Sequence, residues 1–197
     1  FPYTTLFRSE YQLCGSIELD EGFFSTQRDE TEKGKPLKAG RGSQKKAKVL
    51  VMAESTPVEG SKMNIKKQVG HIKMVVIPNL KASTIDVEVA DNIKKESSLI
   101  TDASSSYVHF KSLVGEHVSQ VIEPKEISKV LPWVHIVISN AKRLLLDIYH
   151  DVKSEFLQSY LNEFCYKFNR RNMNCFERLM FACVGYQTEF KHISYRK

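Results

Sequence analysis

Apolar and polar residues alternate along the first segment of the chain whose pattern predicts regular secondary structure. Residues 15–25 are GSIELDEGFFS, so that Leu19 and Phe23 face one side and Glu18 and Asp20 face the other. An alternation of this kind predicts a β-strand. The same reasoning predicts two further strands, at 47–56 and 71–80. Three consecutive strands predict an antiparallel meander.

The spacing of apolar residues changes to a helical period after residue 80. Ile85, Val89 and Ile93 follow one another in steps of four, which predicts a helix over 81–96. A short apolar strand that ends at Asp102 comes next. The remaining elements are predicted as a helix at 107–115, a strand at 117–123, and helices at 133–149, 153–171 and 175–186.

The order of these elements, β-β-β-α-β-α-β-α with further helices, is that of the RNase H-like fold. We therefore expect an α/β protein with a mixed five-stranded sheet, helices on both faces and additional C-terminal helices. In such a sheet the first and fourth strands are neighbours in the middle. The third and fourth strands flank a helix, and we expect them to pair in parallel.

The domain boundaries follow from this order of elements. Residues 10–152 are assigned to the α/β core, and residues 153–197 to a C-terminal helical extension of the same domain. Residues 1–9, FPYTTLFRS, resemble translated sequencing-adapter read-through, and the natural sequence would then begin near Glu10. An ordinary N-terminal tail is the alternative interpretation.

Length, apolar runs, cysteine pattern and net charge limit the classes of protein to which this chain can belong. The 197 residues suit one domain with a sizeable core. No apolar run is long enough for a transmembrane helix, and no signal-peptide layout is present, so we expect a cytoplasmic protein. The four cysteines form no CxxC pair, which argues against a structural zinc site and a disulfide scaffold. The net charge of +6 favours a polyanionic partner, with nucleic acid first.

Basic residues are concentrated in a predicted loop at 27–48, which holds eight Lys or Arg residues and three acids. Glycines are interspersed with the cations, so that backbone amides and cations can both reach phosphate. A solvated loop is the alternative. The candidate phosphate-binding residues are Arg41, Lys45 and Lys46 of the loop, Lys142 and Arg143 of the helix at 133–149, and Arg170 and Arg171 near residue 171.

Two aspartates are predicted to meet in the sheet. Asp20 lies within the first strand, and Asp102 ends the fourth. Two carboxylates a few ångströms apart repel each other, and a divalent ion with a preference for oxygen ligands, Mg²⁺ or Mn²⁺, removes that repulsion. Two such ions about 3.5–4 Å apart clamp both oxygens of a phosphodiester displacement. Taken singly, each aspartate is also explained as a strand-end or turn residue. Glu18 points the same way as Asp20 and is a candidate helper.

A third ligand is expected from the helix at 133–149. Asn140 interrupts its apolar run, and asparagine has poor helix propensity, so a role in a site is one explanation and a surface position the other. His135 lies five residues earlier, and we interpret it as structural. Trp133 is expected to anchor the start of the helix.

The three residues are spaced as D-x81-D-x37-N. With the segments IELDEGFFS, GRGSQKKAKVLVM, LITDASSSY, WVHIVISNAKR and YLNEFCYKFNRR, this pattern resembles the DDE transposases of bacterial insertion sequences, in the group with an ISXO2-like domain. The resemblance covers about residues 10–186 and implies Asp20, Asp102 and Asn140 as the catalytic, metal-binding triad. The wider superfamily commonly has Glu at the third position. Asn is a neutral ligand, and it would bind the second ion more weakly.

The resemblance implies Mg²⁺- or Mn²⁺-dependent cleavage and strand transfer of DNA at transposon ends. It also implies a homo-oligomer at paired ends, contact with target DNA, and a location at the nucleoid. Such transposases usually carry an N-terminal DNA-binding region, which this chain is expected to lack. Two alternatives remain: another RNase H-like nuclease without strand transfer, and an inactive remnant that only binds DNA.

Overall fold

The computed structural model describes residues 11–27, 45–57, 67–103, 109–120, 130–150 and 152–174, with 36, 43, 107, 176–177 and 180. The predicted segment 1–9, most of the basic loop with Arg41, and most of the predicted helix at 175–186 lie outside these ranges. Among the helices of the described ranges, none has the length and apolar character needed to cross a bilayer.

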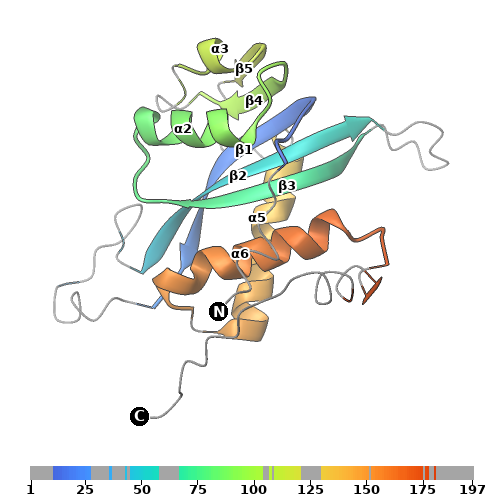
Figure 1. Ribbon diagram of the computed structural model, residues 1–197. Helices are drawn as coiled ribbons and strands as arrows, with labels where there is room; N and C mark the ends of the chain where they lie inside the picture. The colour runs from blue at the N-terminus through green and yellow to red at the C-terminus, as the bar shows by residue number, and fades with distance from the viewer. Residues whose placement is uncertain are drawn as a thin grey trace.

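The sheet has five strands in the order β3-β2-β1-β4-β5, as Figure 1 shows. The strands are β1 Ser16–Ser25, β2 Lys46–Pro57, β3 Lys67–Ile77, β4 Ser98–Asp102 and β5 Glu116–Gln120. β1, β2 and β3 form an antiparallel meander, while β4 pairs in parallel with both β1 and β5. The predicted mixed five-stranded sheet is therefore confirmed, with the first and fourth strands adjacent at its centre.

The expected pairing of the third and fourth strands is wrong. β3 lies at one edge of the sheet, and two strands separate it from β4. The intervening helix α2, Ala82–Asn92, instead carries the chain across the sheet to the open side of β1. There β4 gains a neighbour on each side, and its Leu99 is completely buried. The outer edge of β3 is occupied by a helix.

Helices cover both faces of the sheet, as predicted (Figure 1). One face carries α2 and the short helix α3, Phe110–Leu113, and the other carries α5, Pro132–Leu144, and α6, Ser154–Asn169. Each face has its own apolar core. Ile17 and Leu19 of β1 belong to the core under α2, and Phe24 belongs to the core under α5 and α6.

The helix that was expected at 133–149 changes character before its end. It is α-helical from Pro132 to Leu144 and continues as a single π-helical turn, η4, Leu145–Tyr149. His150 follows with φ of 48°, in the left-handed region. Proline at the start is favourable because its missing N–H would have no partner in the first helical turn. π-Helical turns are rare, and they frequently occur at functional sites.

Side chains of helix α6 form hydrogen bonds with the outer edge of β3, where a sixth strand could otherwise pair. The Gln158 side chain accepts from the Val76 amide at 2.7 Å and donates to the Met74 carbonyl at 2.9 Å. Asn169, three turns later, accepts from the Ile72 amide at 2.8 Å and donates to the Ile72 carbonyl at 2.9 Å. These bonds satisfy outward backbone groups at Ile72, Met74 and Val76 of β3, which also hinders edge-to-edge association.

Asn169→Leu is expected to destabilise the domain by about 1–3 kcal/mol, because it leaves the Ile72 backbone groups without their side-chain partner. Urea unfolding followed by circular dichroism measures this change. Asn172→Leu, at an exposed position just beyond the helix, is the matched control and should stay within about 0.5 kcal/mol of wild type. Equal stability of the two variants would contradict this account of α6.

The two described cysteines lie in different surroundings. Cys165 of α6 is buried, and burial raises the pKa of its thiol to about 12. Cys14, before β1, is exposed. Both are free thiols, and Cys165 stays protonated at neutral pH.

Candidate active site

The register of β1 and β4 leads toward matching positions for the two predicted aspartates. Ser16 is opposite Ser98 and Glu18 is opposite Ile100. Two residues further along each strand come Asp20 and Asp102. Neighbouring strands lie about 4.8 Å apart, and residues abreast in a parallel pair point to the same face. Continued by two residues, this register would set the two carboxylates side by side near the centre of the sheet, where β4 ends.

His135 of α5 approaches Asp20. Its Nε2 lies 3.8 Å from Oδ2 of Asp20, and the two side chains are 30% and 17% exposed. The other carboxylate oxygen of Asp20 accepts from the backbone amide of Glu21 at 2.8 Å. Burial lowers the pKa of His135, and the charge of Lys142 lowers it further, so the imidazole is neutral at neutral pH. The interpretation of His135 as a purely structural residue, which depended on its spacing from Asn140, did not anticipate this contact.

Asn140 lies on a different side of α5. The sheet-facing residues of the helix are Val134, Val137, Ile138 and Ala141, and Asn140 is exposed. At 100° per residue, Asn140 stands about 140° around the helix from His135 and about 160° from Lys142, the two residues that interact with Asp20. Asn140 is therefore not on the side of α5 that meets Asp20, and the roles of Asp20, Asp102 and Asn140 as a ligand triad stay predictions.

Glu18 has a structural task. Its buried carboxylate accepts from the backbone amides of Trp133 at 2.8 Å and Val134 at 3.1 Å, and so caps the N-terminus of α5. Burial raises the pKa of Glu18 to about 7, and the two amide hydrogen bonds and Lys67 oppose this rise. Trp133 also donates its indole N–H to Ser55 at 3.1 Å, as its predicted anchoring role requires. Glu18 thus fixes the helix that faces Asp20.

The pKa of Tyr107 is affected by three acidic residues. It is buried after β4 and stacks on Phe110, with ring centroids 5.0 Å apart. Burial raises the pKa of its phenol, and the charges of Glu21, Asp20 and Asp102 raise it further. One buried group that senses all three carboxylates indicates a concentrated negative potential at this end of β1 and β4, which attracts cations. Nothing in the sequence pattern singled out Tyr107.

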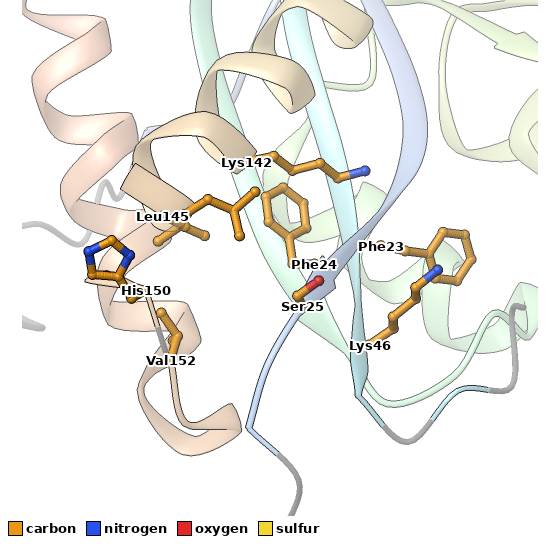
Figure 2. Close-up of a pocket in the computed structure, with 9 residues that line it drawn as sticks. Phe23, Phe24, Ser25, Lys46, Lys142, Leu145, His150 and Val152 are labelled. Carbon is orange, nitrogen blue, oxygen red and sulfur yellow. The ribbon is translucent and has the colours of Figure 1, made fainter. Parts of the chain in front are cut away.

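Two lysines line a pocket at the C-terminal end of β1 (Figure 2). Lys142 of α5 and Lys46 of β2 reach this pocket of about 200 Å³, whose other lining residues are Phe23, Phe24, Ser25, Leu145, Leu146, His150 and Val152. Lys142 lies 5.7 Å from the centre of the Phe24 ring. Burial lowers its pKa, repulsion from Lys46 lowers it further, and attraction to Asp20 opposes both. A basic pocket therefore adjoins the acidic site.

Comparison with known proteins gives the family. The ISXO2-like transposase domain model matches residues 12–169, which include β1, β4 and α5. The chain belongs to this family. No match is found among the curated proteins. Among solved structures, the catalytic core domain of BIV integrase is similar, with a TM-score of 0.46 and 11% sequence identity over 89% of this chain and 100% of that chain.

This protein is thus a DDE-type transposase domain with an RNase H-like α/β fold, as the sequence predicted. Over the described ranges of the transposase domain, no three or more His, Cys, Asp or Glu side chains are grouped closely enough to hold a metal ion. The pair of Asp20 and Asp102 still fits Mg²⁺ or Mn²⁺. Mg²⁺ is usually held by one or two carboxylates, with waters and substrate phosphates completing the shell.

The predicted phosphate-binding residues of the transposase domain divide into two groups. Lys45, Lys46 and Arg143 are exposed, and with Lys142 they belong to the elements around Asp20. Arg170 and Arg171 directly follow the C-terminal end of α6. Arg170 stacks on Tyr166, 3.9 Å from the ring centre.

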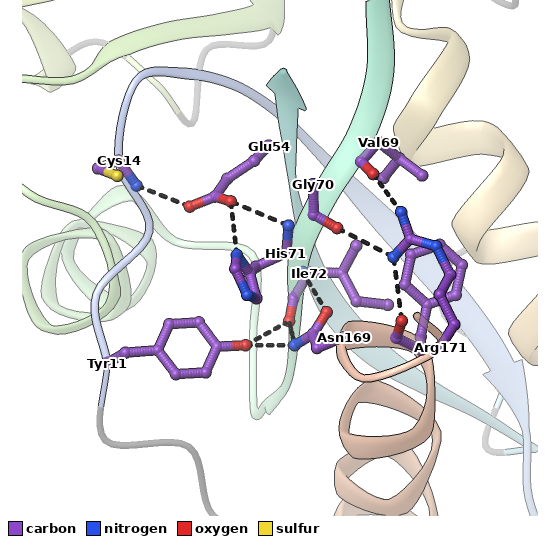
Figure 3. A network of polar contacts seen from close by, with 10 residues as sticks. Tyr11, Cys14, Glu54, Val69, Gly70, His71, Ile72, Asn169 and Arg171 are labelled. Atoms are coloured by element: carbon purple, nitrogen blue, oxygen red, sulfur yellow. Dashed lines mark hydrogen bonds and ion pairs between the residues drawn. The ribbon is translucent and has the colours of Figure 1, made fainter. Parts of the chain in front are cut away.

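Figure 3 shows Arg171 in a polar network at the start of β3. It donates to the carbonyls of Val69, Gly70 and Phe168. The network also includes Asn169 and Tyr11, which share a hydrogen bond. Arg171 therefore continues the cover of the β3 edge that Gln158 and Asn169 begin.

Proposed function

We propose that this domain cuts DNA at the ends of a bacterial insertion sequence and joins the freed strand to target DNA, using Mg²⁺ or Mn²⁺. The observation that supports this most directly is the parallel pairing of β1 with β4 up to Glu18 and Ile100, two residues before Asp20 and Asp102. The basic pocket next to them supplies a place for the charged backbone of the substrate. Asn140 is proposed as the third residue of the site from the family pattern.

Each residue has a distinct task in this reaction. Asp20 and Asp102 hold the divalent ion, which when bound neutralises charge on the phosphodiester and favours attack by water. Glu18 holds α5 against β1. Hydrolysis at the transposon end frees a 3′-hydroxyl, and this hydroxyl then attacks a phosphodiester of the target. Both reactions are displacements at phosphorus by an oxygen, so the protein needs no covalent bond to DNA.

The DNA backbone is assigned to Lys45, Lys46, Lys142 and Arg143, and to Arg41 from the sequence alone. Lys46 and Lys142 face one pocket, and their mutual repulsion is relieved when a phosphate lies between them. Arg171 is assigned to holding α6 on β3, because its guanidinium group donates to the Val69 and Gly70 carbonyls there. Arg170 stacks on Tyr166 of its own helix and stays a candidate for contact with the DNA backbone. A homo-oligomer at paired ends and a location at the nucleoid follow from the proposed reaction.

Lys142→Ala is expected to weaken DNA binding several-fold and to reduce the slope of log Kd against log salt by about 1, because one phosphate contact is lost. Lys46→Ala should do the same. Fluorescence anisotropy with labelled duplex DNA between 50 and roughly 300 mM salt measures both quantities. Lys81→Ala, an exposed lysine just before α2 on the other face of the sheet, is the control. An unchanged slope of log Kd against log salt in both pocket variants would show that the two lysines do not contact the DNA backbone.

A further inference from the structure

The pocket at the C-terminal end of β1 has an apolar part that the DNA backbone does not use. Lys46 and Lys142 can bind phosphate, but apolar side chains give no stabilisation to a charged group. Five lining residues are apolar: Phe24, Leu145 and Val152 are buried, Phe23 is half-buried and Leu146 is exposed. The lining therefore suits a ligand that has both an anionic part and an apolar part.

Phe23 and Leu146 are the two apolar side chains that such a ligand can reach. Neither belongs to the two apolar cores of the described chain, and Leu146 is 56% exposed. Both line the same pocket as the two lysines. A single nucleotide is bound in this way by many proteins, because its base stacks on an aromatic ring while a cation contacts its phosphate.

The backbone on one side of the pocket is unusual in two respects. Leu145 and Leu146 belong to the π-helical turn η4, and π-helical turns are frequent at functional sites. His150, which also lines the pocket, has φ of 48° and ψ of −59°, a combination that non-glycine residues rarely adopt. Strained residues of this kind cluster at ligand-binding sites. Both features indicate that this side of the pocket is shaped for a ligand.

The volume of the pocket limits the size of its ligand. About 200 Å³ is less than the roughly 300–1,000 Å³ of pockets that take drug-sized molecules, and it admits one nucleobase but no base pair. We propose that the pocket binds one unpaired base of the DNA, which packs against Phe23 and Leu146 while the adjoining phosphate lies between Lys46 and Lys142. This inference rests on the proposed function in taking DNA as the substrate.

A base that enters this pocket must first leave the double helix. Unpairing and unstacking cost free energy, and the cost is smallest for a base that has no partner. The domain should therefore bind a duplex with one bulged nucleotide more tightly than the fully paired duplex of the same sequence.

Two bulged duplexes separate binding of the base from binding of the phosphate. One carries a bulged adenosine or thymidine, and the other carries at the same place an abasic residue, which keeps the phosphate. Fluorescence anisotropy should show that the wild-type chain binds the first at least fivefold more tightly, since stacking of one base is worth roughly 5- to 100-fold in affinity. Phe23→Ala and Leu146→Gln should reduce this ratio below about twofold. Lys142→Ala should weaken binding of both duplexes and keep the ratio. Ile148→Gln, at a 59% exposed position of the same π-helical turn outside the pocket lining, is the matched control.

The wild-type chain decides the matter without any variant. Equal affinity for the two bulged duplexes would overturn the base pocket and leave the proposed function standing, because cleavage needs no unpaired base. A ratio that both Phe23→Ala and Leu146→Gln leave unchanged would place the base elsewhere and overturn the pocket as well. Wild-type protein that keeps the ratio but never cuts DNA with Mg²⁺ or Mn²⁺ would overturn the proposed function and support the pocket. Absence of DNA binding would overturn both.

Discussion

Asp102→Asn should abolish metal-dependent cleavage of transposon-end DNA, with a loss of roughly 100- to 1,000-fold in rate. The physical reason is the removal of one of the two carboxylates that are proposed to hold the ion near the centre of the sheet. Amide and carboxylate have nearly the same shape, so the fold should not change. Duplex oligonucleotides of the terminal repeats that flank the gene, incubated with Mg²⁺ or Mn²⁺, show nicked and joined products on a denaturing gel.

Asp20→Asn should give the same loss, and Asp91→Asn, exposed on α2, is the matched control that keeps full activity. Strand joining at the wild-type rate in Asp102→Asn would show that the site is wrongly placed. Two other outcomes separate the alternative functions. Wild-type protein that cuts but never joins is a nuclease of the same fold, and protein that binds DNA without cutting it is an inactive remnant.

Glu18→Ala is expected to have the largest effect on stability, a loss of about 2–4 kcal/mol. Its carboxylate is the acceptor for the backbone amides of Trp133 and Val134, and alanine leaves both N–H groups buried without that partner. The start of α5 should then loosen from β1. Thermal and urea unfolding measure the loss, with Glu116→Ala at an exposed position of β5 as the control.

The pH dependence of stability gives a second measure of the same group. The pKa of Glu18 in the folded protein, about 7, lies above its ordinary value of 4.5, so the folded state binds the proton more tightly than the unfolded state. The stability that this group contributes is complete below about pH 4.5 and is lost as the pH rises through 7. Glu18→Gln keeps one acceptor oxygen and should remove this decline. A wild-type curve that rises over this range, or one that Glu18→Gln leaves unchanged, would contradict the buried cap.

Local patterns in the sequence were sufficient for most of the secondary structure. Alternation in GSIELDEGFFS and the four-residue steps of Ile85, Val89 and Ile93 reflect which side of each element is buried. The spacing that shows this side is local, because it follows from the period of the strand or helix. The two aspartates were also found from the sequence, because their strands could be placed next to each other once the order of elements was known.

The pairing of β4 and the contacts of His135, Glu18 and Tyr107 required the tertiary structure. Glu18 and the amides it caps are 115 and 116 residues apart, and Asn169 reaches Ile72 across 97 residues. Such contacts depend on how the helices cross the sheet. The spacing of apolar residues along the sequence does not show how they cross. The sequence by itself determined most of the elements of the transposase domain and predicted its acidic pair. The folded chain decided what surrounds the pair, because the side of α5 that meets Asp20 is set by packing over the whole sheet.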